Sequence, residues 1–437
     1  MLVLKFGGTS VGSPSAMKNV ASILKSCQEQ KIVVLSAISG TTNVLVQICT
    51  LLQSGKREEA ILKINTLKTE YHTFISDLFE NTKTAQEVVK QINQHFEMLI
   101  SIINDGYLNK DETIILAQGE LMSTHIFNAF IESTQQNSVL IPALEFMRID
   151  KDLEPDMFYI QNNLNRLLNE TGVSTIITQG FICRNAFGDV DNLKRGGSDY
   201  SATLIGKAIG ADRIEIWTDI DGMHNNDPRC IENTQSIKEL HYDEASELAY
   251  FGAKILHPSC VYPAQTANIP LWLKNTMNPK AKGTIISDRS DEQAFKAIAA
   301  KDHITAIKIK SGRMLNAYGF LRSVFEVFER YKTPIDMITT SEVAVSLSID
   351  SDVYLKEITE ELEQFGEVEV DENQTIICVV GDFSMEKTAR ANQVFSALQN
   401  IPIRMISYGG SKRNISILVN SSCKIKALQA LHINCFN

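Results

Sequence analysis

The stretch Leu2-Val3-Leu4-Lys5-Phe6-Gly7-Gly8-Thr9-Ser10-Val11-Gly12-Ser13-Pro14 stands at the start of the chain. Its apolar first residues predict a short buried strand, and the glycines after it predict a tight loop with exposed backbone N–H groups. Ser13 suits the N-cap of a following helix, and Pro14 suits its first position. A strand, a glycine loop and a helix N-terminus together favour an anion such as phosphate, because free amides and the helix dipole both attract negative charge.

This loop differs from a Walker A loop. Gly7 and Gly12 have the right separation, but Ser13 stands where that motif requires a lysine. Lys5 precedes the loop instead, which predicts a different grip on the phosphate. For the motif taken alone, a purely structural glycine turn is the alternative.

Size and charge exclude several classes of protein. The 437 residues are enough for two or three domains with buried cores. A net charge of −10, without a block rich in lysine and arginine, argues against binding to nucleic acid or to an acidic membrane. No apolar run is long enough to cross a bilayer, and no signal peptide is visible at Met1. The 8 cysteines are dispersed, without zinc-ligand spacing, which is typical of a reduced cytoplasmic protein.

Strands and helices alternate from residue 1 to about 290. Further buried strands are predicted at 31–37, 174–181, 213–219 and 269–273. Helices are predicted between the strands at 17–27, 122–133 and 200–209. This order is typical of an α/β protein with a mainly parallel sheet covered by helices on both faces. Residues 56–104 carry apolar residues at helical spacing, which predicts paired surface helices without chemistry of their own.

A polar linker at 286–291 ends this region, and two similar β/α units follow it. The first unit is predicted to have a strand at 304–309, a helix at 320–331 and a strand at 343–349. The second is predicted to have a strand at 375–380, a helix at 391–398 and a strand at 415–419. Two such units in tandem resemble ACT regulatory domains, which bind amino acids at paired interfaces. A generic ferredoxin-like α/β tail is the alternative.

A second motif, Arg195-Gly196-Gly197-Ser198-Asp199, joins an arginine to two glycines and an acidic helix start. Arginine suits the capture of a carboxylate by two hydrogen bonds, and the glycines allow a close approach of the backbone. Asp199 can satisfy helix amides or meet an ammonium ion. Together with Gln179-Gly180-Phe181 and the first loop, this motif resembles the aspartate kinases of the amino-acid kinase family.

The resemblance covers almost the whole chain. It implies a catalytic domain at 1–290, a first ACT domain at 297–371 and a second at 372–437, with the strand near 297–302 assigned to either ACT domain. The implied reaction is ATP-dependent phosphorylation of the L-aspartate side chain to 4-phospho-L-aspartate, the first step of lysine, threonine and methionine biosynthesis. That carboxylate has a pKa near about 4, so it is ionised at neutral pH and needs no general base.

The resemblance also implies the residues that act on aspartate. The implied catalytic residues are Lys5, Gly7, Gly8 and Asp199. The implied substrate contacts are Ser36, Thr42, Glu120, Arg195, Gly196 and Ser198. Ser36 and Thr42 follow a buried strand, and ligands bind at the carboxyl ends of such strands. Glu120 would attract the substrate ammonium group. The alternative is simple complementation of a helix dipole, because we expect a helix to open at Gln118.

The implied ATP site lies on three segments. Its residues are Lys5, Gly8, Thr9, Ser10, Thr218, Asp219, His224, Asp227, Arg229 and Lys254. The members from Asp219 to Arg229 lie in an irregular loop with several turn-forming residues, and His224 stands where the family usually has a tyrosine. Lys254 lies downstream, in the segment 250–258. Mg²⁺ is expected to bridge the ATP phosphates, without a dedicated set of protein ligands. His257, beside a proline, is expected to be a structural residue at a helix end.

The segments 312–321 and 334–342 resemble the effector pocket of lysine-inhibited aspartate kinases. The implied effector contacts are Met314, Phe320, Leu321, Ile335, Asp336, Thr340, Ser341 and Glu342. Asp336 and Glu342 are expected to meet the two ammonium groups of lysine, and Ala317 replaces a serine that is common in lysine-sensitive relatives. A glycine turn before a helix, beside a strand edge, is the alternative.

We therefore expect feedback inhibition by an amino acid, lysine in the first place, and a homodimer or larger assembly through the ACT domains. The alternative is a non-catalytic amino-acid sensor on a kinase scaffold, but the intact Lys5, Glu120, Arg195 and Asp199 argue against it. Kinases for other acids or for nucleotides lack paired ACT-like tails. A fused homoserine dehydrogenase is not expected, because the sequence ends at Asn437 without a dinucleotide fingerprint.

Overall fold

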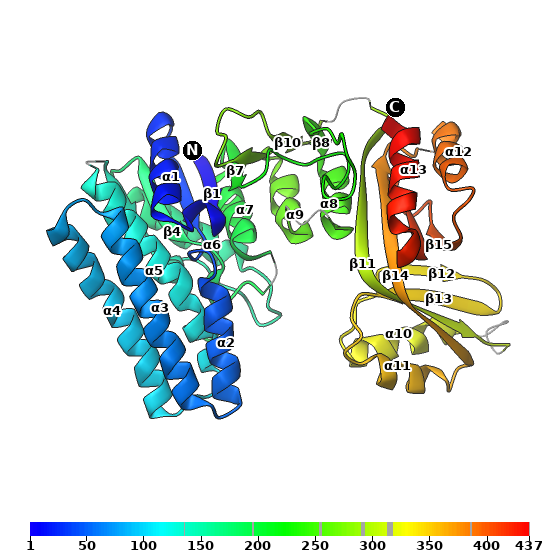
Figure 1. Cartoon of the computed structure of the whole chain (residues 1–437), viewed down its shortest axis with the longest axis horizontal. Coiled ribbons are helices and arrows are strands. Elements are labelled where there is room, and N and C mark those ends of the chain that lie inside the picture. Colours follow the sequence, from blue (N-terminus) through cyan, green and yellow to red (C-terminus); the bar gives the residue numbers. More distant parts are fainter. Residues whose placement is uncertain are drawn as a thin grey trace. The chain divides into compact units, whose positions relative to one another are not determined.

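The computed structural model of the chain describes residues 1–134, 136–194, 196–252, 256–289, 293–312, 318–384 and 387–436. The chain forms two compact units (Figure 1). The first unit comprises Met1–Met223, Lys238–Tyr242 and Ile255–Ser290. The second unit comprises His224–Ile237, Asp243–Lys254 and Asp291–Asn437. The domain boundaries expected from the sequence stay predictions.

An eight-stranded sheet forms the centre of the first unit, in the order β3-β4-β2-β1-β7-β9-β10-β8. Its strands are β1 (Leu2–Phe6), β2 (Lys31–Leu35), β3 (Ser138–Leu140), β4 (Thr175–Gln179), β7 (Arg213–Thr218), β8 (Glu239–His241), β9 (Leu271–Asn275) and β10 (Thr284–Ser287). All neighbours pair in parallel except β9 and β10, so the predicted mainly parallel sheet is confirmed. The strands β1, β2 and β4 are buried along their whole length, as central parallel strands are.

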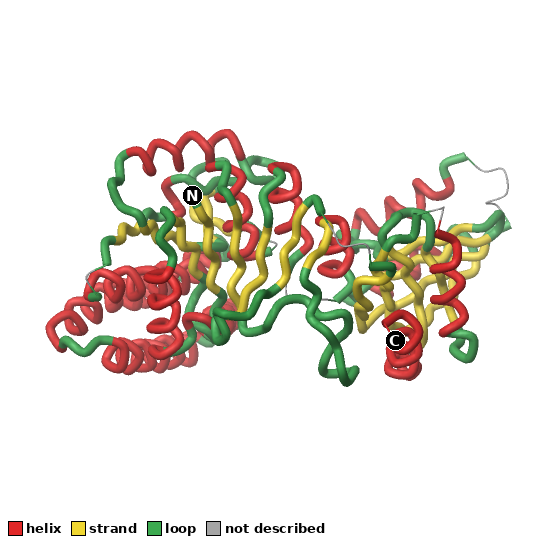
Figure 2. The backbone as a smooth tube through the Cα atoms, turned by 90° about the horizontal axis from the view of Figure 1, so that it is seen from above, coloured by secondary structure: helices red, strands yellow, loops and turns green. Residues whose placement is uncertain are grey.

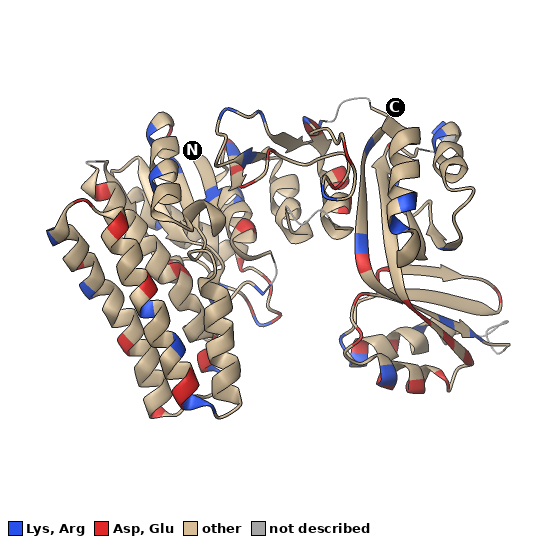
Figure 3. Cartoon of the chain, viewed as in Figure 1, with Lys and Arg blue, Asp and Glu red and all other residues tan. Residues whose placement is uncertain are grey.

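Helices cover this sheet on both sides (Figure 2). They are α1 (Pro14–Ser26), α2 (Thr41–Gln53), α3 (Arg57–Leu78), α4 (Thr82–Asp105), α5 (Asp111–Ser133), α6 (Met157–Asn169), α7 (Gly197–Ile209) and α9 (Pro258–Ala267). The predicted paired helices at 56–104 are confirmed as α3 and α4. Their apolar faces pack with those of α2 and α5 in one core, and acidic and basic residues are interspersed along them (Figure 3). A short hairpin, β5 (Ile182–Arg184) and β6 (Val190–Asn192), follows β4.

Two boundaries differ from the sequence prediction. The helix expected at 122–133 begins eleven residues earlier, because α5 starts at Asp111. The linker expected at 286–291 begins later, because Ile286 and Ser287 belong to β10, where they pair with Leu240 and His241. Both boundaries depend on contacts between residues far apart in the sequence. The local composition of a segment does not predict such contacts.

The second unit contains one antiparallel sheet in the order β12-β13-β11-β14-β16-β15. Its strands are β11 (Phe295–Lys310), β12 (Met337–Thr340), β13 (Ala344–Ile349), β14 (Glu367–Gly381), β15 (Ile403–Ser407) and β16 (Asn414–Asn420). Its helices are α10 (Phe320–Arg330), α11 (Leu355–Leu362), α12 (Thr388–Ala397) and α13 (Lys424–Phe436), and α8 (Tyr242–Tyr250) lies almost entirely in this unit.

The two predicted β/α units are present, but they share this one sheet. The strand expected at 304–309 starts at Phe295, and its first half pairs with the part of β14 that also pairs with β16. Its second half pairs with β13. Two separate clusters of buried residues follow, one around Ile307 and Phe328 and one around Ile377 and Leu431. The unit therefore consists of two modules joined by two long strands.

Among the described residues, no helix is both long enough and apolar enough to span a membrane. Within the same residues, no group of three or more His, Cys, Asp or Glu side chains is arranged to hold a metal ion.

Candidate active site

The glycine loop after β1 folds as the sequence predicts. Ser13 caps α1 by accepting a hydrogen bond from the Ala16 amide at 3.2 Å, and Pro14 is the first helical residue. Between β1 and α1 lies a short 3-10 helix, η1 (Thr9–Val11). The amides of Gly7 and Ser10 donate to the carbonyl oxygens of Trp217 and Gly7, so Gly8 and Thr9 are the better placed loop amides for a ligand.

The loop packs tightly against the turn that follows β2. A Cβ at Gly8 would lie 3.1 Å from the carbonyl oxygen of Ala37, and one at Gly12 would lie 2.9 Å from the Cβ of Ser39. The Ser10 hydroxyl is 2.7 Å from the Thr276 hydroxyl, beyond the end of β9. These contacts hold the loop at the carboxyl end of the sheet, where ligands bind in folds of this class.

Lys5 lies on the central strand and is paired with Asp199. The Lys5 Nζ is 2.6 Å from Asp199 Oδ1, and the two side chains are only 11% and 17% exposed. Asp199 is in the first turn of α7, so this ion pair brings together the two motifs that the sequence singled out. A partly buried ammonium group at the start of a glycine loop can neutralise a phosphoryl group.

Ser198 precedes Asp199 and faces the end of β2. The Ser36 hydroxyl donates to the Ser198 hydroxyl at 3.0 Å. A Cβ at Gly180 would lie 2.3 Å from the Ser198 Cβ, so only glycine fits at that position. Gly196 is the N-cap of α7 and has a φ of 69°, a left-handed conformation that favours glycine. The structure thus groups Ser36, Ser198 and Gly196, whereas Thr42 lies in the first turn of α2, half-buried.

Glu120 is buried in the middle of α5, not in a first helical turn as the sequence suggested. It is 4% exposed, and its Oε1 accepts a hydrogen bond from the Ala37 amide at 3.3 Å. Its Oε2 has no hydrogen-bond partner among the described residues. Burial raises the pKa of Glu120 to about 7. Complementation of a helix dipole therefore does not explain this carboxylate, and an unpaired buried oxygen is a natural contact for an ammonium group.

The residues expected to bind ATP fall in both units. In the first unit, Thr218 ends β7 and its hydroxyl donates to Asp219 at 3.1 Å, while its carbonyl accepts from the Thr276 amide. In the second unit, the Arg229 guanidinium pairs with Asp227 at 2.8 Å and lowers the pKa of that carboxyl group. The ring of His224 hydrogen bonds to the Thr234 hydroxyl at 3.1 Å.

Three of the expected residues cannot be placed. Arg195, Lys254 and Met314 lie outside the described residues, as does Ala317. His257 is the N-cap of α9 and accepts a hydrogen bond from the Ser259 amide at 3.2 Å, which agrees with the structural role expected for it.

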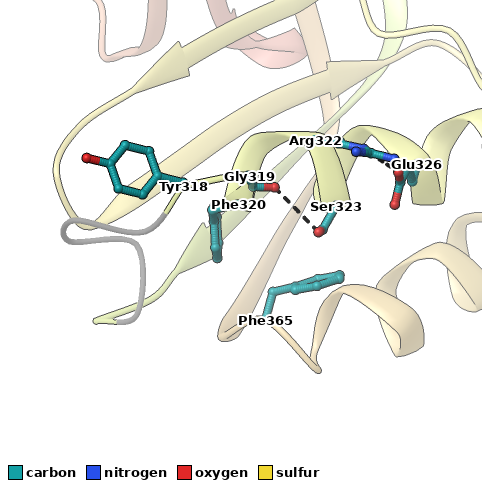
Figure 4. A pocket seen from close by; sticks show the side chains of 7 residues that line it. All are labelled: Tyr318, Gly319, Phe320, Arg322, Ser323, Glu326 and Phe365. Carbon is teal, nitrogen blue, oxygen red and sulfur yellow. Dashed lines mark hydrogen bonds and ion pairs between the residues drawn. The ribbon is translucent and has the colours of Figure 1, made fainter.

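The expected effector residues surround α10 and β12 in the second unit. A cavity of about 410 Å³ is lined by Tyr318, Gly319, Phe320, Arg322, Ser323, Glu326 and Phe365 (Figure 4). Phe320 thus lines a cavity, and Leu321 is the next residue of α10. Asp336 is not among the described lining residues. Thr340 is exposed at the end of β12, Ser341 and Glu342 are exposed after it, and Ile335 is half-buried before the strand.

Asp336 has partners that sequence reasoning missed. Its Oδ1 is 2.7 Å from the Lys301 Nζ and accepts a hydrogen bond from the Tyr250 hydroxyl at 2.8 Å. Ala37, the partner of Glu120, was also missed, because its backbone amide makes the contact. Residue type carries no signal for a backbone contact, and the two partners of Asp336 lie on separate elements, Lys301 on β11 and Tyr250 at the end of α8.

The geometry defines a kind of site first. A mainly parallel α/β sheet with a lysine and a glycine loop at the carboxyl ends of its strands can hold a phosphate or another anionic group. The chain matches the Amino acid kinase family over residues 1–275 and an ACT domain over residues 377–434. The predicted second ACT module is therefore confirmed by an independent match.

Curated relatives and solved structures narrow the class. The chain is 32% identical to "Lysine-sensitive aspartokinase 3" of Escherichia coli, with 100% of this chain and 99% of that protein covered. It is 34% identical to "Aspartokinase 3, chloroplastic" of Arabidopsis thaliana, covering 98% of this chain and 80% of that one. The crystal structure of E. coli aspartokinase III in complex with aspartate and ADP has a TM-score of 0.87 at 32% identity, with both chains covered completely.

The chain belongs to the aspartokinase family. The expectation of an enzyme, an aspartate kinase with ACT regulatory modules, is thereby confirmed, and the rival interpretation as a non-catalytic sensor finds no support among these relatives.

A first prediction concerns the close contact at Gly180. In Gly180→Ala the new Cβ clashes with Ser198, so the start of α7 must shift and carry Asp199 away from Lys5. We expect the free energy of unfolding to fall by about 1–3 kcal/mol. We also expect kcat/KM for aspartate to fall at least about tenfold. Urea unfolding and steady-state kinetics measure both. Gly172→Ala is the matched control, since a Cβ there meets nothing within 4 Å; equal kinetics in the two variants would contradict this account.

A second prediction concerns the buried acid Glu120. Its pKa is about 7 in the folded protein and near 4.5 ordinarily, so the folded state keeps its proton longer as the pH rises. The free energy of unfolding therefore falls as the pH rises from the ordinary pKa to the raised pKa. Relative to wild type, Glu120→Gln should be about 3 kcal/mol more stable at pH 8 and equal to it near pH 4.

Urea unfolding at several pH values measures this difference. The control is Glu97→Gln, the same change at an exposed position of α4, which should show no such pH dependence. A difference for Glu120→Gln that stays constant from pH 4 to pH 8 would mean that Glu120 does not titrate in this range.

Proposed function

We propose that the chain transfers the γ-phosphoryl group of ATP to the side-chain carboxylate of L-aspartate, with Lys5 and Asp199 at the centre of the reaction. An aspartate carboxylate oxygen attacks the γ-phosphorus, the bond to the β–γ bridging oxygen breaks, and ADP leaves with the electron pair. No proton has to move, because the attacking carboxylate is already ionised. The observation that carries this proposal is the partly buried Lys5 ammonium group at the start of the glycine loop.

Alignment of two anions is the main task of such a site. Lys5 would neutralise the transferring phosphoryl group, and the Gly8 and Thr9 amides, with Gly7 and Ser10 beside them, would hold its oxygens. Asp199 keeps the Lys5 side chain in place. The structure of the E. coli relative in complex with aspartate and ADP supports the choice of these two ligands for this fold.

The substrate ammonium group would meet Glu120, whose Oε2 is buried without a partner among the described residues. Ser36, Thr42, Gly196 and Ser198 would contact the rest of aspartate. Arg195 would hold the α-carboxylate through two hydrogen bonds, as guanidinium groups commonly do.

The nucleotide would extend from the glycine loop to Thr218 and Asp219. His224, Asp227, Arg229 and Lys254 are proposed as further nucleotide contacts. Mg²⁺ would be held mainly by phosphate oxygens and water, because Mg²⁺ retains water readily and the described residues offer it no carboxylate cluster.

We further propose that L-lysine inhibits the enzyme through the second unit, with Met314, Phe320, Leu321, Ile335, Asp336, Thr340, Ser341 and Glu342 as contacts. The name of the E. coli relative and its structure with lysine and aspartate support this choice of effector. Binding would act by its differential affinity for active and inactive states. A homodimer through the ACT modules is part of the proposal. So is a cytoplasmic location, which the unpaired cysteines favour.

A third prediction tests Lys5. Lys5→Ala removes the proposed phosphoryl contact, so kcat should fall by about a hundredfold or more, measured as ATP-dependent formation of aspartate hydroxamate. The variant also leaves Asp199 as an unpaired, mostly buried charge, which should cost about 3 kcal/mol of stability.

Adding Asp199→Asn to Lys5→Ala separates these two effects. The double variant should regain stability in urea unfolding but not turnover. If the double variant also regained turnover, the role of Lys5 would be structural.

A fourth prediction tests the effector site. Asp336→Ala should raise the L-lysine concentration for half-inhibition at least about tenfold, because a charged hydrogen bond is lost, while uninhibited turnover stays close to wild type. Glu361→Ala, which removes an acceptor of Tyr331 in the same unit, is the control. Equal inhibition of wild type and Asp336→Ala would remove Asp336 from the proposed site.

A further inference from the structure

Three side chains of the second unit surround the ammonium group of a fourth, Lys301. The three are Asp336, Asp350 and Tyr250, and we call them the ammonium cage. The Lys301 Nζ lies 2.7 Å from Asp336 Oδ1 and 2.9 Å from Asp350 Oδ2. It also lies 4.8 Å from the centre of the Tyr250 ring, and the Tyr250 hydroxyl donates to Asp336 Oδ1. One primary ammonium group is therefore held by two carboxylates and an aromatic ring.

The strand pairing explains why the two carboxylates meet. Asp336 directly precedes β12 and Asp350 directly follows β13, and these strands pair with Met337 opposite Ser348. The Asp336 amide donates to the Ser348 carbonyl, which extends the pairing by one step. Lys301 reaches the same end from β11, next to an irregularity in the pairing between Lys301 and Ile304. The sheet thus brings Asp336, Asp350 and Lys301 together, and Tyr250 joins them from the end of α8.

Burial of one carboxylate, that of Asp336, favours a cation in the cage. The Asp336 side chain is 1% exposed, so its negative charge needs a nearby positive charge. Burial alone would lower the pKa of Lys301, but hydrogen bonds to Asp336 and Asp350 outweigh it and raise the pKa. The ring of Tyr250 adds an attraction that aromatic faces exert on ammonium groups. Asp336 Oδ2 is buried and has no hydrogen-bond partner among the described residues, so the carboxylate keeps one unused acceptor atom.

We propose that Asp336, Asp350 and Tyr250 form a binding site for a primary ammonium group, that Lys301 fills this site from within the chain, and that an ammonium group of L-lysine competes with Lys301 for it. This inference rests on the proposed inhibition by lysine. Lys301 and free lysine carry the same alkylammonium group, so the cage cannot distinguish them by charge or by hydrogen bonding. The internal side chain therefore sets the lysine concentration at which the effector binds.

The cage also contacts the segment that follows α8. Tyr250 is the last residue of α8, and Phe251 and Gly252 continue from it. Gly252 has a φ of 123°, and a Cβ there would lie 2.2 Å from the carbonyl oxygen of Ala300, the residue before Lys301. Residues 250–252 thus pack directly on β11 at the cage. An exchange of ammonium groups on Asp336 would take place beside the Tyr250 ring and its hydroxyl, and that gives the effector a physical route to the end of α8.

The test removes the internal ammonium group. Lys301→Met keeps an unbranched side chain without the charge, and Lys308→Met is the matched control on the same strand, where Lys308 pairs with Glu369 at 3.1 Å. In a kinase assay, Lys301→Met should be half-inhibited at an L-lysine concentration about tenfold lower than wild type, because the competitor is gone. Lys308→Met should match wild type. Equal lysine dependence in all three proteins would overturn the proposal.

A second readout needs no kinase activity. The melting temperature is measured with and without n-butylammonium chloride, which carries only the primary ammonium group. It should rise more for Lys301→Met than for wild type or Lys308→Met, with sodium chloride at equal ionic strength as the salt control. If L-lysine fails to inhibit wild type, the proposed effector is wrong. The n-butylammonium measurement still tests whether the cage binds a primary ammonium group. The cage fails if n-butylammonium stabilises all three proteins equally.

If Lys301→Met does not fold, Tyr250→Phe replaces it. This variant keeps the ring beside Lys301 but removes one of the donors to Asp336 Oδ1. The L-lysine concentration for half-inhibition should then change by about threefold or more, since a hydrogen bond to a charged group is lost. The control is Tyr331→Phe, which deletes an equivalent bond to Glu361 at 2.7 Å. An unchanged value in Tyr250→Phe would overturn the proposal.

Discussion

The ion pair between Lys5 and Asp199 is the constraint on which the first unit depends. An ammonium group on the central strand of a buried sheet costs several kcal/mol unless a counter-charge is close. β1 pairs with β2 and β7 on its two sides, so the counter-charge has to come from beyond the strand ends. The first turn of α7 supplies it. One charge pair thus fixes where the glycine loop and the start of α7 meet.

Close packing at glycine residues then shapes the site. Gly8, Gly119 and Gly180 each lie where a Cβ would meet the neighbouring chain within about 3 Å, at Ala37 for the first two and at Ser198 for the third. The turn after β2 is therefore the element around which the site is arranged. Walls made of backbone offer N–H groups at fixed positions, which is what anionic ligands require.

The sequence predicted the parallel sheet, the Ser13 cap, the paired helices and the two tail modules, because each has a local pattern of apolar residues or capping residues. It misplaced the start of α5, since Gln118-Gly119-Glu120 reads locally as a helix opening although the helix passes through it. It shortened β11, because residues 295–301 are held in a strand by pairing with β14. Ala37, Lys301 and Tyr250 escaped notice for the same reason: their partners are distant in sequence, and their residue types carry no special signal.

The electrostatics of Glu120 link substrate capture to a proton. Burial outweighs the hydrogen bond from the Ala37 amide and raises its pKa to about 7, so the carboxyl group is roughly half protonated at neutral pH. On the proposed role, a substrate ammonium group beside Oε2 favours the charged form and lowers that pKa again. Binding of aspartate near pH 7 then releases part of a proton from Glu120, and affinity rises with pH until the free carboxyl group is fully ionised. The cost of burying an acid thus becomes a dependence of substrate affinity on pH.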